Sequence, residues 1–320
     1  MNLNALPAHP LTAVFVDANQ TLALGFRRLH QPKGWTLRIN EQADVSPDEL
    51  PALLGGATIA VIDHTAFPTA VARKATGLRH VVFLGTGARS YMNIEELAEL
   101  GISVHTIKGY GDVAVAECAF GLMWAAAKKF GLMDRGIRAG QWLRTDGTQL
   151  RGKTLGLVGF GGIAQELARL AIGAGMNVVA WNRSPKAFDG VTFLELDDVL
   201  GLSDVISLHL LLDNETRGLL SRDRIAALRP GAILVNTARG ALLDEDALVD
   251  ALRSGHIAHA ALDVFVTEPL PEAHPLANLP NVTLSAHSAF RTLEASDNLV
   301  IAALAHCERI ADESAFAGAA

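Results

Sequence analysis

Short apolar runs alternate with stretches of helical hydrophobic spacing along the first third of the chain. This alternation predicts βαβ units and a parallel sheet with both faces covered by helices. The expected strands are Thr12–Val16, Trp35–Ile39, Ala57–Ile62, His80–Leu84 and Ser103–Thr106, and the expected helices lie near Ser46–Leu54, Pro68–Ala75 and Ile94–Glu99.

A second series of the same kind begins at Thr154. A long helix rich in Ala and Leu, which Asp112 can cap, is expected to lead into it. The chain of 320 residues is long enough for about two domains of ordinary size. The expected strands are Thr154–Val158, Asn177–Trp181, Val205–Leu210, Ala232–Asn236, His259–Val264 and Val282–Leu284, with helices at Arg222–Leu228, Glu245–Ser254 and Leu293–Asp312.

A glycine-rich turn joins the first strand of this second series to a helix that runs from Gly162 through Leu170. Gly159 permits a tight turn, Gly161 lets the backbone approach a diphosphate, and Ala164 allows the helix to pack closely on the strand. The exposed N–H groups and the positive end of the helix favour a bound phosphate. The turn predicts a dinucleotide site; the alternative is an ordinary turn between strand and helix.

The residues after the next strand select between the two nicotinamide dinucleotides. An Asp or Glu about 20 residues beyond the glycines binds the ribose 2′-hydroxyl of NAD, whereas an Arg nearby accommodates the 2′-phosphate of NADP. The chain has Asn182, Arg183 and Ser184 here, and no acid. Arg183 supplies a fork-shaped cation, and its neighbours can donate hydrogen bonds. We expect NADPH to be preferred over NADH, with a solvated turn arginine as the alternative.

Composition narrows the class of protein. The formal net charge of −7 argues against nucleic acid or an anionic membrane as a partner, because both attract basic patches. No uninterrupted apolar run reaches the roughly 18 residues of a spanning helix, and the first residues lack the pattern of a signal peptide. Cys118 and Cys307 are too few for a disulfide framework or a thiolate metal site. We expect a soluble, cytoplasmic protein without a metal.

Three polar segments follow strands of the second series. They are Asn236–Gly240, Asp263–Pro269 and Ser285–Thr292. Because the carboxyl ends of parallel strands lie at one edge of a sheet, these segments should gather on the cofactor side. Each is weak evidence by itself, since an arginine after a strand is often a surface residue and a lone histidine is often structural.

In this order after a dinucleotide turn, the segments resemble the D-isomer-specific 2-hydroxyacid dehydrogenase family, which includes glyoxylate/hydroxypyruvate reductases and phosphoglycerate dehydrogenases. The resemblance covers most of the chain and is densest from Val104 to Thr292. It is carried by Gly109–Glu117, the Gly159–Ala164 turn, Thr216–Leu220, Arg229–Gly240, Ala261–Phe265 with Glu268 and Pro269, and the segment around His287.

The resemblance implies roles for residues that match the family's motifs. Arg239 would bind the substrate carboxylate and polarise its carbonyl, a bidentate task that suits a guanidinium. His287 would give a proton to the carbonyl oxygen as hydride arrives, and Glu268 would orient His287 and stabilise its protonated form. The implied cofactor contacts are Gly159, Gly161, Gly162, Ile163, Asn182, Arg183, Ser184, His209, Thr216, Thr237 and Asp263, with Asp263 near the nicotinamide.

The resemblance also implies the domain map and the assembly. A flavodoxin-like substrate domain would be discontinuous, made of residues 1–103 and 293–320. A Rossmann cofactor domain, residues 104–292, would be inserted into it, with the active site in the cleft between the two. The family usually forms homodimers through the cofactor domain and the helix leading into it, which here follows Asp112.

The chain departs from the family's pattern in the substrate loop. The usual G-x-G-x-D is here Gly85-Thr86-Gly87-Ala88-Arg89, so Arg89 replaces the acid. The backbone N–H groups of Gly87 and Ala88 would still bind a substrate carboxylate. Arg89 is either a structural replacement or a contact to an acidic or extended substrate. Asp112 is either a helix cap or a partner for a cationic substrate group.

Three functions fit these residues. The first is an NADPH-preferring reductase of small 2-keto acids, acting reversibly as a D-2-hydroxyacid dehydrogenase. The second is a reductase of 2-imino acids that makes amino acids with the same catalytic groups. The third is a cofactor-sensing binding protein, which the complete set of Arg239, Glu268 and His287 argues against.

Overall fold

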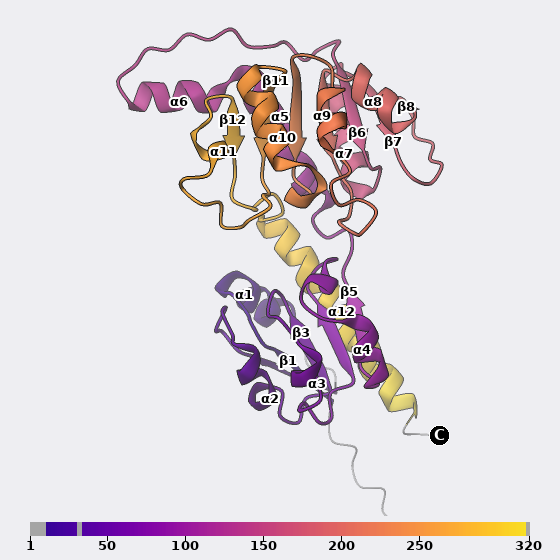
Figure 1. Cartoon of the computed structure of the whole chain (residues 1–320). Helices are drawn as coiled ribbons and strands as arrows, with labels where there is room; N and C mark the ends of the chain where they lie inside the picture. The colour runs from indigo at the N-terminus through magenta and orange to yellow at the C-terminus, as the bar shows by residue number, and fades with distance from the viewer. Residues whose placement is uncertain (1–10, 31–33, 318–320) are drawn as a thin grey trace, which may run out of the picture. The chain divides into compact units, whose positions relative to one another are not determined.

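The computed structural model describes residues 11–30 and 34–317, which form two compact units (Figure 1). One unit comprises the described residues of Met1–Gly111 and Thr292–Ala320, and the other is Asp112–Arg291. The first break lies after Gly111, whereas the sequence placed it after residue 103. The difference arises because β5 (Ser103–Thr106) pairs along its whole length with β4 (His80–Phe83), so the entire strand belongs to the first sheet.

The first unit contains a five-stranded parallel sheet with the strand order β2-β1-β3-β4-β5. This is the order of flavodoxin-like sheets, so the predicted fold class of this unit is confirmed. The remaining elements are β1 (Thr12–Phe15), α1 (Gln20–Leu29), β2 (Thr36–Ile39), η1 (Pro47–Glu49), α2 (Leu50–Leu53), β3 (Ile59–Ile62), α3 (Thr69–Ala72), η2 (Ala88–Ser90), α4 (Ile94–Glu99) and α12 (Leu293–Ala317).

Two apolar cores cover the two faces of this sheet. The side chains of α2, α3 and α4 pack on one face, where Leu50 and Leu97 are fully buried. The side chains of α1 and α12 pack on the other face, where Phe26 and Val300 are fully buried. Because α12 comes from the far end of the sequence, the last helix completes the core of the first unit.

The sequence patterns did not predict α1. Its interior contains Thr21 and Gly25, which are weak helix formers. The helix is supported instead by Asn19, whose side chain accepts a hydrogen bond from the Leu22 N–H at 3.0 Å, and by contact with α12. Gly25 lies against Val300, where an added Cβ would be 3.2 Å from a methyl carbon. Tertiary packing therefore determines this helix.

The second unit contains a seven-stranded parallel sheet with the order β12-β11-β10-β9-β6-β7-β8. Counted from β6, this is the Rossmann order 3-2-1-4-5-6 with one further strand, which confirms the prediction. The elements are α5 (Asp112–Lys128), α6 (Phe130–Arg138), β6 (Thr154–Val158), α7 (Gly162–Gly173), β7 (Asn177–Trp181), β8 (Val191–Phe193), α8 (Leu196–Leu202), β9 (Val205–Leu208), α9 (Arg222–Ala226), β10 (Ala232–Asn236), η3 (Gly240–Leu242), α10 (Glu245–Ser254), β11 (Ile257–Leu262), α11 (Pro275–Asn278) and β12 (Val282–Leu284).

Helices cover both faces of this sheet as well. The helices α5 and α7 pack on one face and α8, α9 and α10 on the other. Successive residues of β10 alternate between the two cores, with Leu234 in one and Val235 in the other. Both sides of the central strands are therefore buried, and polar groups are exposed mainly at the strand ends. In the described ranges, no helix combines the length and the apolar character needed to cross a bilayer.

Three imidazoles meet where α12 crosses β4 and β5. His80 Nδ1 lies 3.2 Å from His105 Nε2, and the rings of His105 and His306 are 5.5 Å apart. Arg309 donates to His105 Nδ1 at 3.3 Å, so the neutral ring carries its proton on Nε2, toward His80. Burial and the neighbouring His80, Arg309 and His306 lower the pKa of His105 to about 4.

This cluster predicts that acid weakens the first unit. The fold keeps His105 neutral, whereas the unfolded chain binds a proton at the ordinary pKa of about 6.5. The stabilisation is therefore complete above that pH and is lost as the pH falls toward 4. Hydrogen exchange at the amides of β4 and β5, corrected for intrinsic rates, should show less protection in acid. His105→Gln, which does not titrate, should reduce this loss; an equal loss in both proteins would contradict the assignment.

Candidate active site

A buried carboxylate organises the carboxyl end of β11. Asp263 is fully buried and accepts hydrogen bonds from Ser285 Oγ at 2.6 Å, from the Ser288 N–H at 3.0 Å and from the Ala289 N–H at 2.9 Å. Its own backbone C=O accepts from the His287 N–H at 2.7 Å. Asp263 thus fixes the loop after β12 through His287 itself and through residues that precede and follow it.

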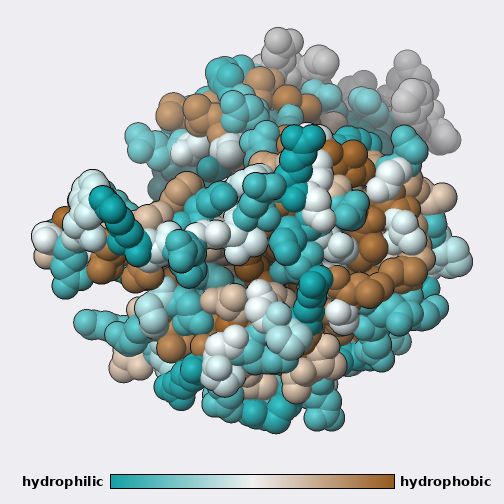
Figure 2. All heavy atoms as spheres, turned by 90° about the horizontal axis from the view of Figure 1, so that it is seen from above, coloured by the Kyte–Doolittle hydropathy of each residue, from teal (hydrophilic) through white to brown (hydrophobic). Residues whose placement is uncertain are grey.

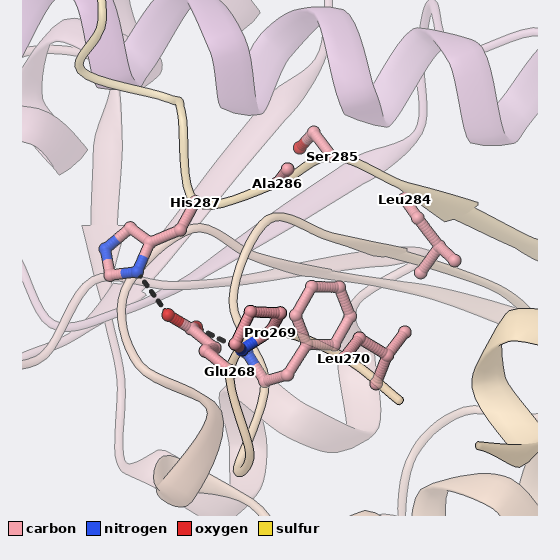
Figure 3. Close-up of a pocket in the computed structure, with 8 residues that line it drawn as sticks. Glu268, Pro269, Leu270, Leu284, Ser285, Ala286 and His287 are labelled. Carbon is pink, nitrogen blue, oxygen red and sulfur yellow. Dashed lines mark hydrogen bonds and ion pairs between the residues drawn. The ribbon is translucent and has the colours of Figure 1, made fainter. Parts of the chain in front are cut away.

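His287 is held in an uncommon backbone conformation. Its φ is 47°, in the left-handed region that costs a residue with a Cβ about 1 kcal/mol or more. The contacts of Asp263 to the residues on either side compensate for this cost. The result is an imidazole projected from the loop toward Glu268, as Figure 3 shows.

Glu268 pairs with His287 and is itself positioned by the backbone. Glu268 Oε2 lies 2.6 Å from His287 Nδ1, while Oε1 accepts a hydrogen bond from the Phe265 N–H at 2.9 Å. The carboxylate is therefore fixed at both oxygens. In Figure 3 the other ring nitrogen of His287 points away from Glu268, Pro269 and Leu270. This leaves Nε2 available for proton exchange with a bound molecule.

An apolar hollow of about 660 Å³ lies beside this pair. It is lined by Phe265, Pro269, Leu270 and Leu284 together with the His287 segment. In Figure 3, Pro269 and Leu270 lie on the Glu268 side of the imidazole, opposite Nε2. The two paired side chains border this hollow and are 40% and 34% exposed, so a bound molecule can reach them.

Arg239 follows β10 and is placed by two neighbours. Asn236 donates to the Arg239 C=O at 2.9 Å and accepts from the Ala238 N–H at 3.0 Å, which closes the turn. Gly240 touches the backbone of Phe265 so closely that an added Cβ would lie 2.0 Å from its carbonyl carbon. This approach brings the Arg239 turn against the segment that carries Glu268. All three predicted catalytic residues therefore belong to adjacent strand ends of one unit.

The glycine turn after β6 has the expected construction. Gly159 has a φ of 91°, and an added Cβ would lie 2.6 Å from the His209 C=O. Gly161 precedes α7, and an added Cβ there would meet no atom within 4 Å. A diphosphate can therefore approach this backbone, as dinucleotide sites require. Ala164 is fully buried against the strand, and Ile163 packs beside it at the edge of the core.

Asp112 begins α5, and its carboxylate lies against the first turn of α7. A Cβ on Gly162 would be 1.8 Å from Asp112 Oδ2, so a larger residue at position 162 would displace this carboxylate. Burial and the nearby charge of Glu166 raise the pKa of Asp112.

Two buried polar atoms at the same sheet edge lack a hydrogen-bond partner among the described residues. They are His209 Nδ1, after β9, and Thr237 Oγ1, after β10. His209 Nε2 is engaged with Ser207 Oγ at 2.8 Å, and burial lowers the pKa of His209 to about 4, so the ring is neutral. Unpartnered buried groups of this kind fit a site that a polar ligand completes. Together with the open Gly161, they fit a bound dinucleotide.

The loop after β7 carries Asn182, Arg183 and Ser184. Asn182 Oδ1 accepts from the Phe160 N–H at 3.1 Å, and its Nδ2 donates to the Ser184 C=O at 2.8 Å. Asn182 therefore ties this loop to the glycine turn. Arg183 is exposed and forms an ion pair with Glu215 at 2.7 Å.

Thr216 closes the turn that follows β9. Its hydroxyl donates to the Leu211 C=O at 2.7 Å and accepts from the Asp213 N–H at 2.8 Å. The hydroxyl also lies 3.0 Å from Asp213 Oδ1, so it stabilises the backbone and the Asp213 side chain of this turn.

The predicted substrate loop belongs to the first unit, at the carboxyl end of β4. Gly87 precedes the single turn η2, and Ala88 is buried within it. Arg89 Nη1 and Nη2 donate to the two carboxylate oxygens of Glu95 at 2.9 and 2.6 Å. This bidentate pair favours the structural interpretation of Arg89 over a substrate contact. The three residues thus lie in a different unit from Arg239, Glu268 and His287.

Several positioning residues were not given an individual role from the sequence, although three of them lie in polar segments expected at this edge. Asn236, Gly240, Ser285 and Glu215 act through turn geometry, backbone contact or side-chain pairing. The signal available for Asn236 and Gly240 was their place in the quoted Arg229–Gly240 segment. Within residues 11–30 and 34–317, no group of three His, Cys, Asp or Glu side chains has an arrangement that could hold a metal ion.

Comparison with known proteins gives consistent matches. The family model for "D-isomer specific 2-hydroxyacid dehydrogenase, NAD binding domain" matches residues 120–289. The chain is 40% identical over 248 residues to a glyoxylate reductase of Aeropyrum pernix, covering 71% of this chain and 74% of the relative. It is 35% identical over 254 residues to a hydroxypyruvate reductase of Thermotoga maritima, covering 78% and 83%.

A solved structure shares the fold across the whole length of the chain. An acyclic imino acid reductase, solved in complex with NADPH and D-Arg, superposes with a TM-score of 0.83 and covers 95% of this chain and 98% of its own. At 24% identity this likeness concerns the fold alone. The family model, by contrast, matches the sequence across the segments that carry Arg239, Glu268 and His287, and the two curated relatives match more than two thirds of the chain. The chain belongs to the D-isomer-specific 2-hydroxyacid dehydrogenase family, whose members are nicotinamide-dependent oxidoreductases.

Proposed function

We propose that this protein reduces small 2-keto acids to D-2-hydroxy acids with hydride from NAD(P)H, and that it prefers NADPH. The observation that carries the proposal is the His287–Glu268 pair at the sheet edge that also bears Arg239. The curated relatives named for reduction of glyoxylate and hydroxypyruvate support a small 2-keto acid as the substrate class.

His287 is the proposed proton donor. Because Nδ1 faces Glu268, a protonated ring presents its Nε2–H to the carbonyl oxygen of the substrate. The fixed carboxylate of Glu268 stabilises the positive charge of the ring and its orientation. In the reverse direction the neutral Nε2 accepts the proton of the hydroxyl group. The bound cofactor supplies the hydride.

Arg239 is the proposed carboxylate receptor. Its Nη1 donates to the Ala238 C=O at 2.6 Å, which restricts the guanidinium, and it has no other hydrogen bond within the described residues. The remaining N–H groups suit bidentate binding of the substrate carboxylate and polarisation of its carbonyl. We further propose that the backbone N–H groups of Gly87 and Ala88 bind a substrate carboxylate.

The cofactor is proposed to lie along the carboxyl edge of the second unit. Gly159, Gly161, Gly162 and Ile163 would hold the diphosphate at the start of α7. His209, Thr216, Thr237 and Asp263 would line the rest of the site, and Asn182, Arg183 and Ser184 would surround the 2′ position of the ribose. NADH remains usable in this arrangement because only the 2′-phosphate depends on Arg183.

Reduction of 2-imino acids is the alternative function. It uses the same carboxylate receptor, and the fold neighbour solved with NADPH and D-Arg favours retaining it. Oxidation of NADPH with glyoxylate, hydroxypyruvate and pyruvate, each with and without ammonia, separates the two. We expect turnover that does not require ammonia. Turnover only in its presence would support the imino acid reductase, and cofactor binding without turnover across the panel would support a binding protein.

Replacement of the proton donor tests the mechanism. His287→Ala should lower kcat by about 100- to 10,000-fold, the range typical of a general acid. The dissociation constant for NADPH, measured by calorimetry, should change by less than about threefold because the hydride and the diphosphate contacts are elsewhere. The matched control His256→Ala lies before β11, away from this edge, and should retain turnover. Near-normal turnover in His287→Ala would refute the assignment.

We also propose that the protein is a homodimer joined through the second unit. Exposed hydrophobic side chains gather on α5, α6 and the loop that follows: Phe130 is 56%, Ile137 57% and Trp142 78% exposed. Leu143 packs back on Gly136 of α6, which leaves Trp142 outside. Figure 2 shows hydrophobic residues at the surface of this projecting segment. A second copy would bury them.

The dimer is tested by analytical ultracentrifugation. A charge at the centre of a buried interface is strongly unfavourable, so Ile137→Asp should shift the protein toward monomer. The matched control is Leu24→Asp on α1, because Leu24 is equally exposed at 57% but lies in the first unit. It should leave the dimer intact. A native protein that sediments as a monomer would contradict the proposal.

A further inference from the structure

The ion pair between Arg183 and Glu215 spans the predicted adenosine site. Arg183 follows β7 and Glu215 follows β9, and in the sheet these strands lie on either side of β6. The pair therefore bridges the end of the strand from which the glycine turn begins. Arg183 Nη1 lies 2.7 Å from Glu215 Oε2, and both side chains are about three-quarters exposed, at 73% and 74%.

The turn that carries Glu215 is firmly built. Asp213 Oδ1 accepts from the N–H groups of Glu215 and Thr216, each at 2.9 Å. These bonds, with the Thr216 hydroxyl, hold Glu215 on the side of the turn that faces Arg183. Hydrogen bonds from Thr216 and Glu215 lower the pKa of Asp213, and the positive charge of Arg183 lowers it further. The turn therefore carries a second carboxylate near Arg183.

This arrangement conflicts with a simple preference for NADPH. A 2′-phosphate needs N–H groups of Arg183, and Glu215 already engages Nη1 of that guanidinium. The phosphate carries a charge of about −1.5 to −2 at neutral pH. It therefore competes with Glu215 for the guanidinium and is repelled by the Glu215 and Asp213 carboxylates. The uncharged 2′-hydroxyl of NADH meets no such repulsion and can donate a hydrogen bond to a carboxylate oxygen.

We propose that Glu215 sets the cofactor selectivity of this enzyme, as a carboxylate that competes with the 2′-phosphate for Arg183. The inference rests on the proposed binding of NADPH by Arg183 and deepens it. Glu215 reduces the difference in affinity between NADPH and NADH, so that the protein accepts both cofactors. Removal of its charge makes the protein more selective for the phosphorylated cofactor.

Binding of cofactor fragments to the unmodified apoprotein and its variants tests the proposal without reference to turnover. Isothermal titration calorimetry gives the affinities for 2′,5′-ADP and 5′-AMP, which differ only by the 2′-phosphate. Glu215→Gln should bind 2′,5′-ADP about threefold to tenfold more tightly, the effect of removing one exposed like charge at short range. Its affinity for 5′-AMP should be unchanged or slightly lower. The control Asp250→Asn removes a carboxylate from a similar exposed pair with Arg222 and should change neither affinity.

A double-mutant cycle separates this inference from the NADPH proposal. Arg183→Ala should abolish most of the preference for 2′,5′-ADP over 5′-AMP. If Arg183→Ala leaves that preference unchanged, the proposed NADPH site is wrong. If Arg183→Ala reduces it but Glu215→Gln does not raise it, Glu215 has no role in selectivity. In the Arg183→Ala background, Glu215→Gln should have at most the small effect of reduced repulsion, because competition for the guanidinium has been removed.

Discussion

The buried carboxylate of Asp263 is the constraint on which the catalytic edge depends. Its side chain accepts three hydrogen bonds from the loop after β12, and its backbone C=O accepts a fourth from His287. A left-handed residue with a Cβ is unfavourable by itself, so these bonds are what keep His287 in place. The family resemblance implies a place for Asp263 near the nicotinamide. Its contacts within the chain also give it a positioning role for the catalytic histidine.

The other parts of the edge are fixed by backbone contact. Gly240 contacts the backbone of Phe265, and the Phe265 N–H donates to Glu268. The turn that carries Arg239 and the carboxylate of Glu268 are therefore fixed by contacts to the same residue. The charged side chains of Glu268 and His287 are therefore held in fixed positions, next to an apolar hollow. Such preorganisation suits a reaction in which a proton and a hydride reach neighbouring atoms of one carbonyl group.

Much of the architecture could be predicted from the sequence because buried parallel strands leave a strong hydrophobic pattern. The order of the strands followed from the family resemblance. The elements α1, α6 and β8 were not predicted. Helix α1 depends on the Asn19 cap and on packing against α12 more than on its own residues. The helix α6 is separated from α5 by Lys129, whose φ of 54° interrupts the helical backbone.

Site residues could be predicted from the sequence where the chemistry requires a particular residue type. They could not be predicted where a residue's role depends on which side chain the fold places beside it. Arg239, Glu268 and His287 were identified from motifs, and they occupy adjacent strand ends as expected of one parallel sheet. The partners of Arg89 and Arg183 were not foreseen, because Glu95 and Glu215 are brought to them by the fold. An arginine whose guanidinium is paired with a carboxylate binds a ligand anion less readily than a free one. The spacing of residues along the chain does not reveal such pairing.

We propose that the residues at the carboxyl edge of the second sheet direct hydride to the 2-carbon of a keto acid. Incubation of hydroxypyruvate with NADPH that carries deuterium at both C4 positions, followed by NMR and chiral analysis of the product, measures it directly. The account predicts D-glycerate with deuterium at carbon 2, and no transfer of deuterium in the His287→Ala protein on the same timescale. Deuterium absent from carbon 2, or an L-configured product, would contradict it.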